Sequence, residues 1–356
     1  MEKRIAMKML AESVLMILSL AAGSTTVAAH EHCEEVDGIT SICGLHSPED
    51  LTVTADGNVL FTQMAAGAGV SLLNVESLQV SHLYRADESQ PQPGWGDPGC
   101  VASPGEDILV HGLDLSKRTD DRWQLLTTNH GGRESVEAFE FFPGESPALV
   151  WRGCIELPEE LTFNDVASLP GGGFLATHQY TRGQGLWGLI KAMLGMDTGA
   201  VYRWSPGAGF QELPETAAPF PNGIVAAPDG KHFFVNSWAG GEVRKYSLEP
   251  VVLQGVAQIQ GPDNASWGPD GQLLVASHRY SLTSLADGFP QEDGGPAPLR
   301  FAIVSLDPQT MEHRDILLRE GAPMGAGTTA VMLGEYLYIG SYLGDRMIRV
   351  PVELLN

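Results

Sequence analysis

The sequence of 356 residues is poor in positive charge. It carries 21 lysine and arginine residues against 44 aspartate and glutamate residues, which gives a formal net charge of -23 at pH 7. A surface this acidic repels phosphate backbones and anionic lipid, so nucleic acid is disfavoured as a partner and cations are favoured. After the first 29 residues, no apolar run is long enough for a transmembrane helix. A G-x-S-x-G motif is also missing, which leaves a serine esterase mechanism without support.

Cysteine is scarce as well, and its four copies all lie in the first half of the chain, at Cys33, Cys43, Cys100 and Cys154. Because they lack C-x-x-C or Cys/His spacing, they are typical of disulfides in an oxidising compartment rather than of a zinc site. Three pairings are open from the sequence. We expect Cys33 to pair with Cys43 and Cys100 to pair with Cys154.

Residues 1–29 have the three-part layout of a secretory signal peptide. Basic residues among the first eight precede a charge-free apolar run over 13–23, and small residues close the segment at 27–29. The apolar run is too short to span a bilayer. We therefore expect an exported protein, periplasmic or secreted, in which residues 30–356 form the mature domain. An uncleaved anchor at the membrane interface is the alternative.

Glycine and proline are abundant, with 42 and 23 copies, and short β-rich runs alternate with turns, which indicates an all-β protein. A turn with glycine followed by a short strand recurs six times, at a mean spacing of about 55 residues that is typical of four-stranded propeller blades. We predict a six-bladed β-propeller, with a two-domain β-sandwich as the alternative. The copies are TADGNVLFTQ (54–63), DDRWQLLTTN (120–129), LPGGGFLATH (169–178), APDGKHFFVNS (227–237), GPDGQLLVAS (268–277) and LGEYLYIGS (333–341).

Four of these copies carry polar side chains at one offset, seven residues before a fixed point of the turn. Equivalent positions of different blades lie on a ring around a propeller axis, so these side chains should converge near one end of the channel. Carboxylates and amides that are forced together stay undersatisfied unless a cation lies among them, and oxygen ligands select Ca²⁺ over zinc or copper. The alternative is that each is an ordinary turn former at a strand start. The positions are Glu49-Asp50, Asn164-Asp165, Asn222 and Asp263-Asn264.

Seven segments carry a resemblance to a known family. They are HSPEDLTV (46–53), HGLDL (111–115), LLTTNHGGRESVEAFEF (125–141), FNDVASL (163–169), FPNGIVAAPDGKHFFV (220–235), PDNASWGPDGQLLVASH (262–278) and GTTAVMLGEYLYIGS (327–341). In this order they resemble the paraoxonase family of arylesterases and lactonases, which are calcium-dependent six-bladed propellers. The NHxGRxSVExFxF run is the most specific part, whereas the PNGI and PDG motifs also occur in sugar lactonases and strictosidine synthase-like propellers.

Carried over position by position, the resemblance implies two calcium ions. The implied ligands of a catalytic ion are Glu49, Asn164, Asn222, Asp263 and Asn264. The implied ligands of a buried structural ion are Asp50, Asp165 and the backbone carbonyl of Leu113.

The resemblance also implies a histidine dyad, His111 and His130, near the catalytic calcium. An imidazole titrates near neutrality and can take a proton from water while a second imidazole orients it. The alternatives are a core histidine at 111, a loop histidine at 130 and a calcium-bound carboxylate as the base. Phe220 and His278 match pocket-lining positions, with plain packing as the alternative.

The only convincing helical pattern, GLWGLIKAMLGM at about 185–196, falls where the family has a helix over the active-site mouth. It is apolar on more than one side. We therefore expect a short lid helix that covers an apolar pocket or touches a membrane or lipid particle, with core packing as the alternative.

The sequence departs from the family in three places. No cysteine follows Cys154, so closure of the ring must depend on strand pairing. Gln179 stands where the family has an acid near the pocket, and the loop at 64–69 lacks the basic and aromatic residues of the animal proteins. These changes put the substrate range in doubt and leave the calcium positions intact.

The resulting hypothesis is a calcium-dependent lactonase and arylesterase that takes a small-molecule lactone or ester with an apolar acyl part. His111, supported by His130, would deprotonate the water that attacks the carbonyl carbon. Two alternatives stay open from the sequence. One is a sugar-acid lactonase of the gluconolactonase type with a polar pocket. The other is a non-catalytic propeller that keeps calcium for structure alone and binds a partner on its top face.

Overall fold

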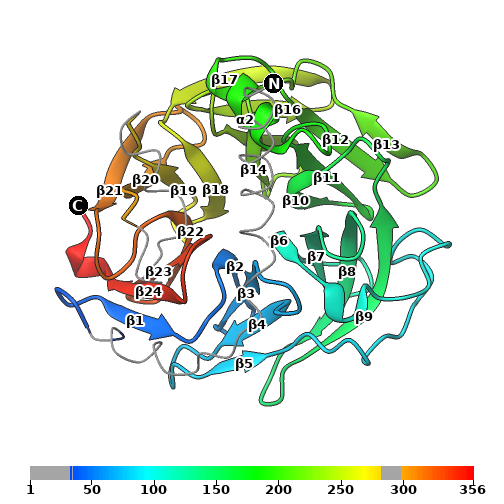
Figure 1. Cartoon of the computed structure of the whole chain (residues 1–356), viewed down its shortest axis with the longest axis horizontal. Helices are drawn as coiled ribbons and strands as arrows, with labels where there is room; N and C mark the ends of the chain where they lie inside the picture. Colours follow the sequence, from blue (N-terminus) through cyan, green and yellow to red (C-terminus); the bar gives the residue numbers. More distant parts are fainter. Residues whose placement is uncertain (1–32, 34, 282–297) are drawn as a thin grey trace, which may run out of the picture.

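Six four-stranded antiparallel sheets stand around a central channel in the computed structural model, as Figure 1 shows. The prediction of an all-β six-bladed propeller is confirmed. The structure describes residues 33, 35–281 and 298–356. The expected signal peptide at 1–29 lies outside the described residues.

Each of the first five blades consists of four consecutive strands, which run from the innermost strand at the channel to the outermost at the rim. The first blade contains β2 (Pro48–Val53), β3 (Val59–Gln63), β4 (Val70–Leu73) and β5 (Val80–His82). The second contains β6 (Val110–Lys117), β7 (Trp123–Asn129), β8 (Ser135–Phe142) and β9 (Ala148–Glu156). The third contains β10 (Phe163–Leu169), β11 (Gly173–His178), β12 (Ala200–Ser205) and β13 (Gly209–Glu212).

The fourth and fifth blades follow the same plan. The fourth contains β14 (Pro221–Ala226), β15 (His232–Ser237), β16 (Glu242–Leu248) and β17 (Val251–Gln258). The fifth contains β18 (Pro262–Trp267), β19 (Leu273–His278), β20 (Phe301–Leu306) and β21 (His313–Arg319).

The sixth blade joins the two ends of the chain. Its inner strands are β22 (Gly327–Leu333), β23 (Tyr336–Ser341) and β24 (Arg346–Pro351), and its outermost strand is β1 (Thr40–Cys43) from the other end of the sequence. β1 pairs antiparallel with β24 from Thr40 opposite Arg349 to Cys43 opposite Arg346. The expected closure by strand pairing is therefore confirmed.

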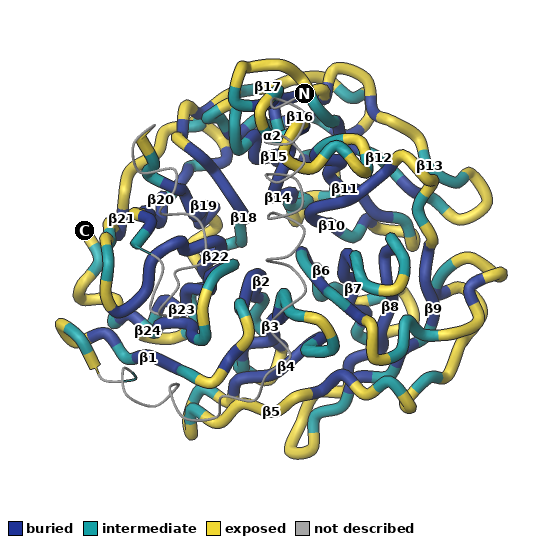
Figure 2. Tube along the Cα trace, in the orientation of Figure 1, coloured by how far each residue is buried: buried dark blue, intermediate teal, exposed yellow. Residues whose placement is uncertain are grey.

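Burial decreases from the channel to the rim, as Figure 2 shows. The second strand of each blade is covered on both faces by its neighbours, which explains the nearly continuous apolar runs such as LLVASH in β19. Apolar side chains of adjacent blades interlock, for example Leu274 and Ile303 of the fifth blade with Ile339 of the sixth. The core is thus a series of layers between blades, and the polar inner strand starts stand out against it.

The described residues contain one α-helix, α2 (Gly185–Met193), between β11 and β12, and short 3-10 helices at Gly105–Asp107 (η1) and Val352–Leu354 (η3). The helix ends three residues before the predicted limit of 196, because Gly195 adopts a φ of 76°, the left-handed conformation that terminates helices. Within the described part of the chain, none of the helices has the length and hydropathy that crossing a membrane requires.

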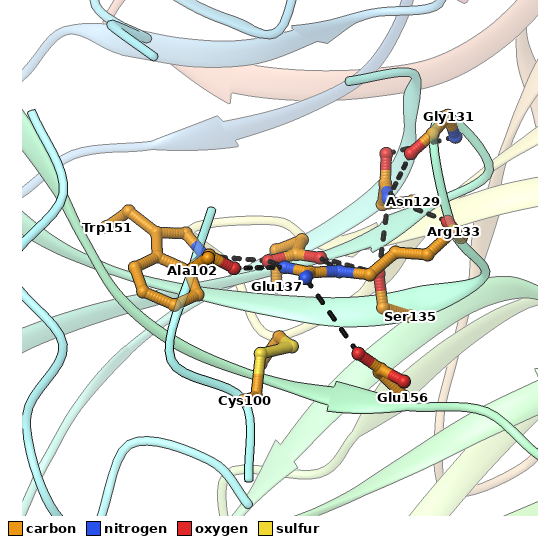
Figure 3. Close-up of a disulfide and its surroundings, with 10 residues drawn as sticks. Cys100, Ala102, Asn129, Gly131, Arg133, Ser135, Glu137, Trp151 and Glu156 are labelled. Carbon is orange, nitrogen blue, oxygen red and sulfur yellow. Dashed lines mark hydrogen bonds and ion pairs between the residues drawn. A yellow bond between two sulfur atoms is a disulfide. The ribbon is translucent and has the colours of Figure 1, made fainter. Parts of the chain in front are cut away.

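Both expected disulfides are present, Cys33–Cys43 and Cys100–Cys154. The first closes a short loop that ends in β1. The second joins the long connection between β5 and β6 to strand β9, beside the buried network drawn in Figure 3. Disulfides of this kind indicate an oxidising environment.

Candidate active site and calcium positions

All six innermost strands are bulged at their start. The first residue of each strand pairs with the second strand, and the ladder then skips one or two residues before pairing resumes. A bulge re-aims the skipped side chains, which no longer alternate between the two faces of the sheet. The first skipped residue of each strand belongs to a set that we call the first ring. The residue after it belongs to a set that we call the second ring. The first ring consists of Glu49, His111, Asn164, Asn222, Asp263 and Thr328. The second consists of Asp50, Gly112, Asp165, Gly223, Asn264 and Thr329.

Five members of the first ring line a pocket of about 330 Å³ at one end of the channel. They come from five different blades, and four of them were predicted to converge from their shared offset in the sequence. The remaining wall is largely aromatic and aliphatic, with Met64, Tyr180, Leu189, Phe220, Trp238, Tyr280, Leu299 and Tyr342. A polar floor therefore lies at the base of an apolar pocket.

Four buried oxygen atoms at this floor accept no hydrogen bond from any described residue: Glu49 Oε2, Asn164 Oδ1, Asn222 Oδ1 and Asn264 Oδ1. Two of the amide groups are turned so that their nitrogens are already used. Asn164 Nδ2 donates to Gln179 Oε1 over 3.1 Å, and Asn264 Nδ2 donates to Glu49 Oε1 over 2.8 Å. Burial of unpaired oxygen atoms is unfavourable, so the arrangement fits a cation with a preference for oxygen ligands.

The electrostatics of the floor agree with this fit. Burial, followed by the charge of Glu49, raises the pKa of Asp263 well above its ordinary value. Two nearby carboxylates cannot both stay ionised at low cost unless a positive charge compensates them. Hard oxygen donors without a thiolate are the set that calcium prefers.

A second pair of carboxylates, Asp50 and Asp165, lies in the second ring. Burial and the charge of Glu49 raise the pKa of Asp50 to about 8, and burial and the charge of Asp50 raise the pKa of Asp165. Each carboxylate accepts one main-chain N–H from the next blade, Leu113 N to Asp50 Oδ2 over 2.9 Å and Ile224 N to Asp165 Oδ2 over 2.8 Å. The contact made by Leu113 is thus through its N–H, whereas the resemblance assigns a role to its carbonyl oxygen.

Glycine allows the inner strands of neighbouring blades to approach each other within the second ring. A Cβ atom on Gly112 would lie 2.6 Å from Asp165 Cα, and one on Gly223 would lie 2.7 Å from Asn264 Cα. Real Cβ atoms do not come this close to a backbone atom. The second blade therefore needs glycine at 112 for the Asp165 backbone to reach its place beside the axis.

The main chain of the first ring is held by side chains of a neighbouring blade. Thr128 Oγ1 donates to the carbonyl of Asn164 over 2.9 Å, and Thr328 Oγ1 donates to that of Glu49 over 2.6 Å. The same bond is made from Thr177 to the carbonyl of Asn222 and from Asn236 to that of Asp263. These bonds fix the positions of candidate ligands from four blades before any ion binds.

His111 and His130 lie side by side next to the floor. His111 Nε2 is 3.4 Å from Glu49 Oε1, and His111 Nδ1 is 3.4 Å from His130 Nε2. Burial lowers the pKa of His111, but the charge of Glu49 and the contact with it outweigh burial, so the pKa lies above its ordinary value. Asp50 and Glu134 raise this pKa as well, so a cation that neutralises Glu49 would remove the largest cause of the rise.

A third ring contains His130, Gln179 and His278, which the sequence analysis named singly, and adds Met64, Trp238 and Tyr342, which it missed. In each blade, the first residue of the inner strand pairs with a residue near the end of the second strand. The residue that follows this partner faces the pocket or the dyad. A signal existed, since each glycine turn fixes the length of the strand after it. The six residues are Met64, His130, Gln179, Trp238, His278 and Tyr342.

His278 is held in its neutral form by burial and by a hydrogen bond that it accepts. Trp238 Nε1 donates to His278 Nδ1 over 3.1 Å, so the ring proton must be on Nε2, which lies 3.3 Å from Asp263 Oδ2. Burial lowers the pKa of His278 to about 4. With Nδ1 occupied and Nε2 protonated, His278 has no lone pair for a water molecule, so its place in the pocket suits orientation of Asp263 rather than general-base chemistry.

Phe220 and helix α2 shape the mouth of the pocket. The Phe220 ring lies 5.6 Å from the rings of both Tyr180 and Trp238, centroid to centroid. The helix packs on Tyr180 through Gly188, where a Cβ atom would lie 2.8 Å from the Tyr180 Cβ. Its residue Leu189 lines the pocket and Met193 Sδ lies 4.0 Å from the Tyr280 hydroxyl, whereas Leu186, Trp187 and Ile190 are exposed.

Two other features of the described residues are less suited to chemistry. A hollow of about 530 Å³ around Arg279, Arg300 and Asp315 is larger than the pocket, but it contains none of the predicted site residues. Cys100, Cys154 and Glu156 are grouped closely enough to hold a metal ion, but both sulfur atoms are used in the disulfide. The pocket above the two rings is therefore the candidate active site.

A family model described as arylesterase matches residues 102–344 of the chain. That segment contains the second to fifth blades, two strands of the sixth and all candidate residues except Glu49 and Asp50. A search of curated proteins found no match.

Solved structures with a similar fold cover most of the chain. A luciferin-regenerating enzyme has 12% identity and a TM-score of 0.56, and the match covers 88% of this chain and 94% of that one. A gluconolactonase from Xanthomonas campestris has 15% identity and a TM-score of 0.51, with 89% of each chain covered. A calcium-binding protein, regucalcin, from Agrobacterium tumefaciens has 14% identity and a TM-score of 0.51, with 87% and 91% covered. Identities this low show the fold alone.

Proposed function

Because the chain belongs to the arylesterase family, we propose that it is a calcium-dependent hydrolase of lactones with an apolar acyl part, with aryl esters as side substrates. Family membership supports a hydrolase of the lactonase and esterase type. The observation that carries the finer proposal is the set of four buried, unpartnered oxygen atoms at the floor of the aromatic pocket. The calcium-binding regucalcin fold is consistent with the choice of metal.

We assign the catalytic calcium to Glu49, Asn164, Asn222, Asp263 and Asn264, and a structural calcium to Asp50, Asp165 and Leu113. The catalytic ion, when bound, supplies Lewis-acid polarisation of the substrate carbonyl and compensates the negative charge that develops on its oxygen. His111 accepts a proton from the attacking water, and His130 orients His111. A carboxylate of the floor as the base is the competing assignment.

The walls of the pocket favour a substrate with an apolar part. Phe220, Trp238 and Tyr280 surround the space above the floor, and Leu189 closes it from the side of α2. A sugar lactone carries hydroxyl groups that Phe220 and Leu189 cannot satisfy, and Trp238 Nε1 already donates to His278. The pocket therefore argues for an acyl lactone and against the gluconolactonase alternative.

Two features concern where the enzyme works: its disulfides and the exposed apolar side chains of α2. Two disulfides indicate an oxidising compartment, and we propose that the chain is exported by the signal at 1–29. On α2, the side chains of Leu186 and Trp187 are 65% and 58% exposed, next to the pocket wall formed by Leu189. We propose that this apolar face touches a membrane or lipid particle at the pocket mouth.

The first test is proton release from a short-chain and a long-chain γ-lactone, with calcium and after its removal by EDTA. We expect hydrolysis that needs calcium and favours the long chain. Asn222→Ala should lower both calcium affinity and kcat, whereas Asn74→Ala, which changes an exposed turn asparagine, should leave both unchanged.

Other outcomes separate the alternatives. Preference for gluconolactone over the long-chain lactone would indicate a sugar-acid lactonase. Full activity without calcium would contradict the metal-assisted mechanism. Two bound calcium ions without turnover of any lactone or aryl ester would indicate a binding propeller instead of an enzyme.

A further inference from the structure

A carboxylate that the sequence did not single out, Glu134, lies directly behind the histidine dyad. Its Oε2 atom is 2.9 Å from His130 Nδ1 and accepts a second hydrogen bond from Thr162 Oγ1 over 3.1 Å. Burial raises the pKa of Glu134. The hydrogen bond from His130 and the charge of His130 lower the pKa by more, so it lies below its ordinary value. Glu134 is therefore ionised near neutral pH, where imidazole groups titrate, and accepts both hydrogen bonds.

An ionised carboxylate has no proton to donate, so it accepts from His130 Nδ1 and fixes the proton of the neutral ring on that nitrogen. His130 Nε2 then holds a lone pair that points toward His111 Nδ1, 3.4 Å away. That contact in turn selects the tautomer of His111 with the proton on Nδ1. The free lone pair of the dyad is thereby placed on His111 Nε2, beside Glu49 at the polar floor.

We propose that Glu134 is a positioning residue that sets the tautomers of His130 and His111 in sequence, so that His111 Nε2 receives the proton of the attacking water. The proton passes from the water oxygen to His111 Nε2 as the bond from oxygen to the carbonyl carbon forms. It then passes to the alkoxide oxygen that leaves when the ring C–O bond breaks. Between these two transfers the dyad carries one positive charge, and the carboxylate of Glu134 stabilises it.

The position of Glu134 is fixed by the loop that carries it. Asn129 Nδ2 donates to the carbonyls of Gly131 and Arg133, each over 2.9 Å, which closes the turn around His130. Arg133, next to Glu134, forms a two-point contact with the fully buried Glu137, over 2.9 and 3.0 Å, as Figure 3 shows.

The far side of the Glu137 carboxylate is also held. Trp151 Nε1 donates to it over 2.7 Å, and Arg133 reaches on to the carbonyl of Ala102 near the Cys100–Cys154 disulfide. The segment NHGGRESVE (129–137) is therefore a rigid loop, which we call the bracket. Its Arg and second Glu hold the loop, and its first Glu faces the dyad.

The inference depends on the proposed lactonase function for its kinetic part, but its central measurement does not. Two-bond ¹H–¹⁵N correlation spectra of the ¹⁵N-histidine protein report which ring nitrogens are protonated. We expect protonated Nδ1 and bare Nε2 for His130 in the wild-type protein. In Glu134→Gln, whose amide can donate as well as accept, this preference should be lost.

Kinetics with a long-chain lactone give the second readout. Glu134→Gln should lower kcat by about 10- to 100-fold with KM changed by less than about twofold, as expected for a partner that orients a catalytic group. Glu134→Asp keeps the carboxylate and should recover part of kcat. The matched control is Glu156→Gln, which removes an exposed carboxylate 3.9 Å from Arg133 and should change nothing.

The outcomes are distinct. A bare Nδ1 on His130 in the wild-type spectrum would overturn the proposal whether or not any variant folds. Wild-type kcat in Glu134→Gln, or equal losses in the Asp and Gln variants with the tautomer unchanged, would do the same. A wild-type protein with no activity on any lactone but with the expected His130 tautomer would refute the lactonase function and leave the positioning role in place.

Discussion

Removal of calcium should make the free energy of unfolding fall as the pH rises from about 5 to about 9. In the calcium-free protein, burial and the charge of Glu49 raise the pKa of Asp50 from 3.8 to about 8. A carboxyl group with a raised folded-state pKa keeps its proton after the unfolded chain has lost it. Its stabilising contribution is fully present below about pH 4 and is lost as the pH rises through about 8.

The magnitude follows from the difference between the two pKa values. From 3.8 to about 8, at about 1.4 kcal/mol per pKa unit, Asp50 alone accounts for about 6 kcal/mol. Asp165 acts in the same direction, because burial and the charge of Asp50 raise its pKa too. Since a domain is typically stable by about 5–15 kcal/mol, the calcium-free protein should approach unfolding above about pH 8.

The assay is urea unfolding, followed by circular dichroism, of protein stripped of calcium by EDTA at neutral pH and then freed of chelator. With calcium restored, both carboxylates are ionised and compensated, so the decline between about pH 5 and about pH 9 should disappear. Asp50→Asn, which cannot titrate, should flatten the decline without calcium. A free energy of unfolding that stays constant or rises with pH in the stripped wild-type protein would refute this reasoning.

Three further predictions concern packing, the pocket and the exposed helix. Gly112→Ala should lower stability by about 2–4 kcal/mol in thermal unfolding, because its Cβ would overlap the backbone of the third blade, whereas Gly99→Ala, which has open space, should not. Phe220→Ala should raise KM for a long-chain lactone by about tenfold and leave kcat nearly unchanged, because the ring contacts the acyl part and not the reacting carbonyl. Trp187→Ser should reduce sedimentation with zwitterionic liposomes and spare the hydrolysis of soluble lactones, whereas Val101→Ser, equally exposed elsewhere, should affect neither; equal binding by all three proteins would contradict a lipid role for α2.

The six blades and the convergence of polar residues were predictable because a propeller repeats one backbone geometry. A fixed distance from each glycine turn was enough to bring Asn164, Asn222 and Asp263 into one pocket, and the structure brings them together there. The disulfide pairing and closure by strand pairing were likewise within reach of the sequence. The first two features repeat along the chain, and the position of the last cysteine at 154 leaves strand pairing to close the ring.

Other features have no periodic signal. Glu134 is one residue in the bracket, and its contact with His130 depends on how the contact between Arg133 and Glu137 bends that loop. The orientation of α2 could not be read either, because the helix is apolar on several sides. The packing of Gly188 against Tyr180 and the burial of Ala192 decide that Leu186, Trp187 and Ile190 face outward.

The closure of the ring has a consequence for solubility. Strand β1 is held to the last blade by non-covalent contacts, the ladder with β24 and the packing of Ile42 against Met347, because the Cys33–Cys43 disulfide joins two residues of the same N-terminal segment. If proteolysis or fraying released β1, a row of unpaired backbone groups on β24 would be exposed, and such an edge can recruit a strand from another molecule. Strand β1 thus protects the propeller against self-association, and its loss would appear as aggregation of an otherwise folded propeller.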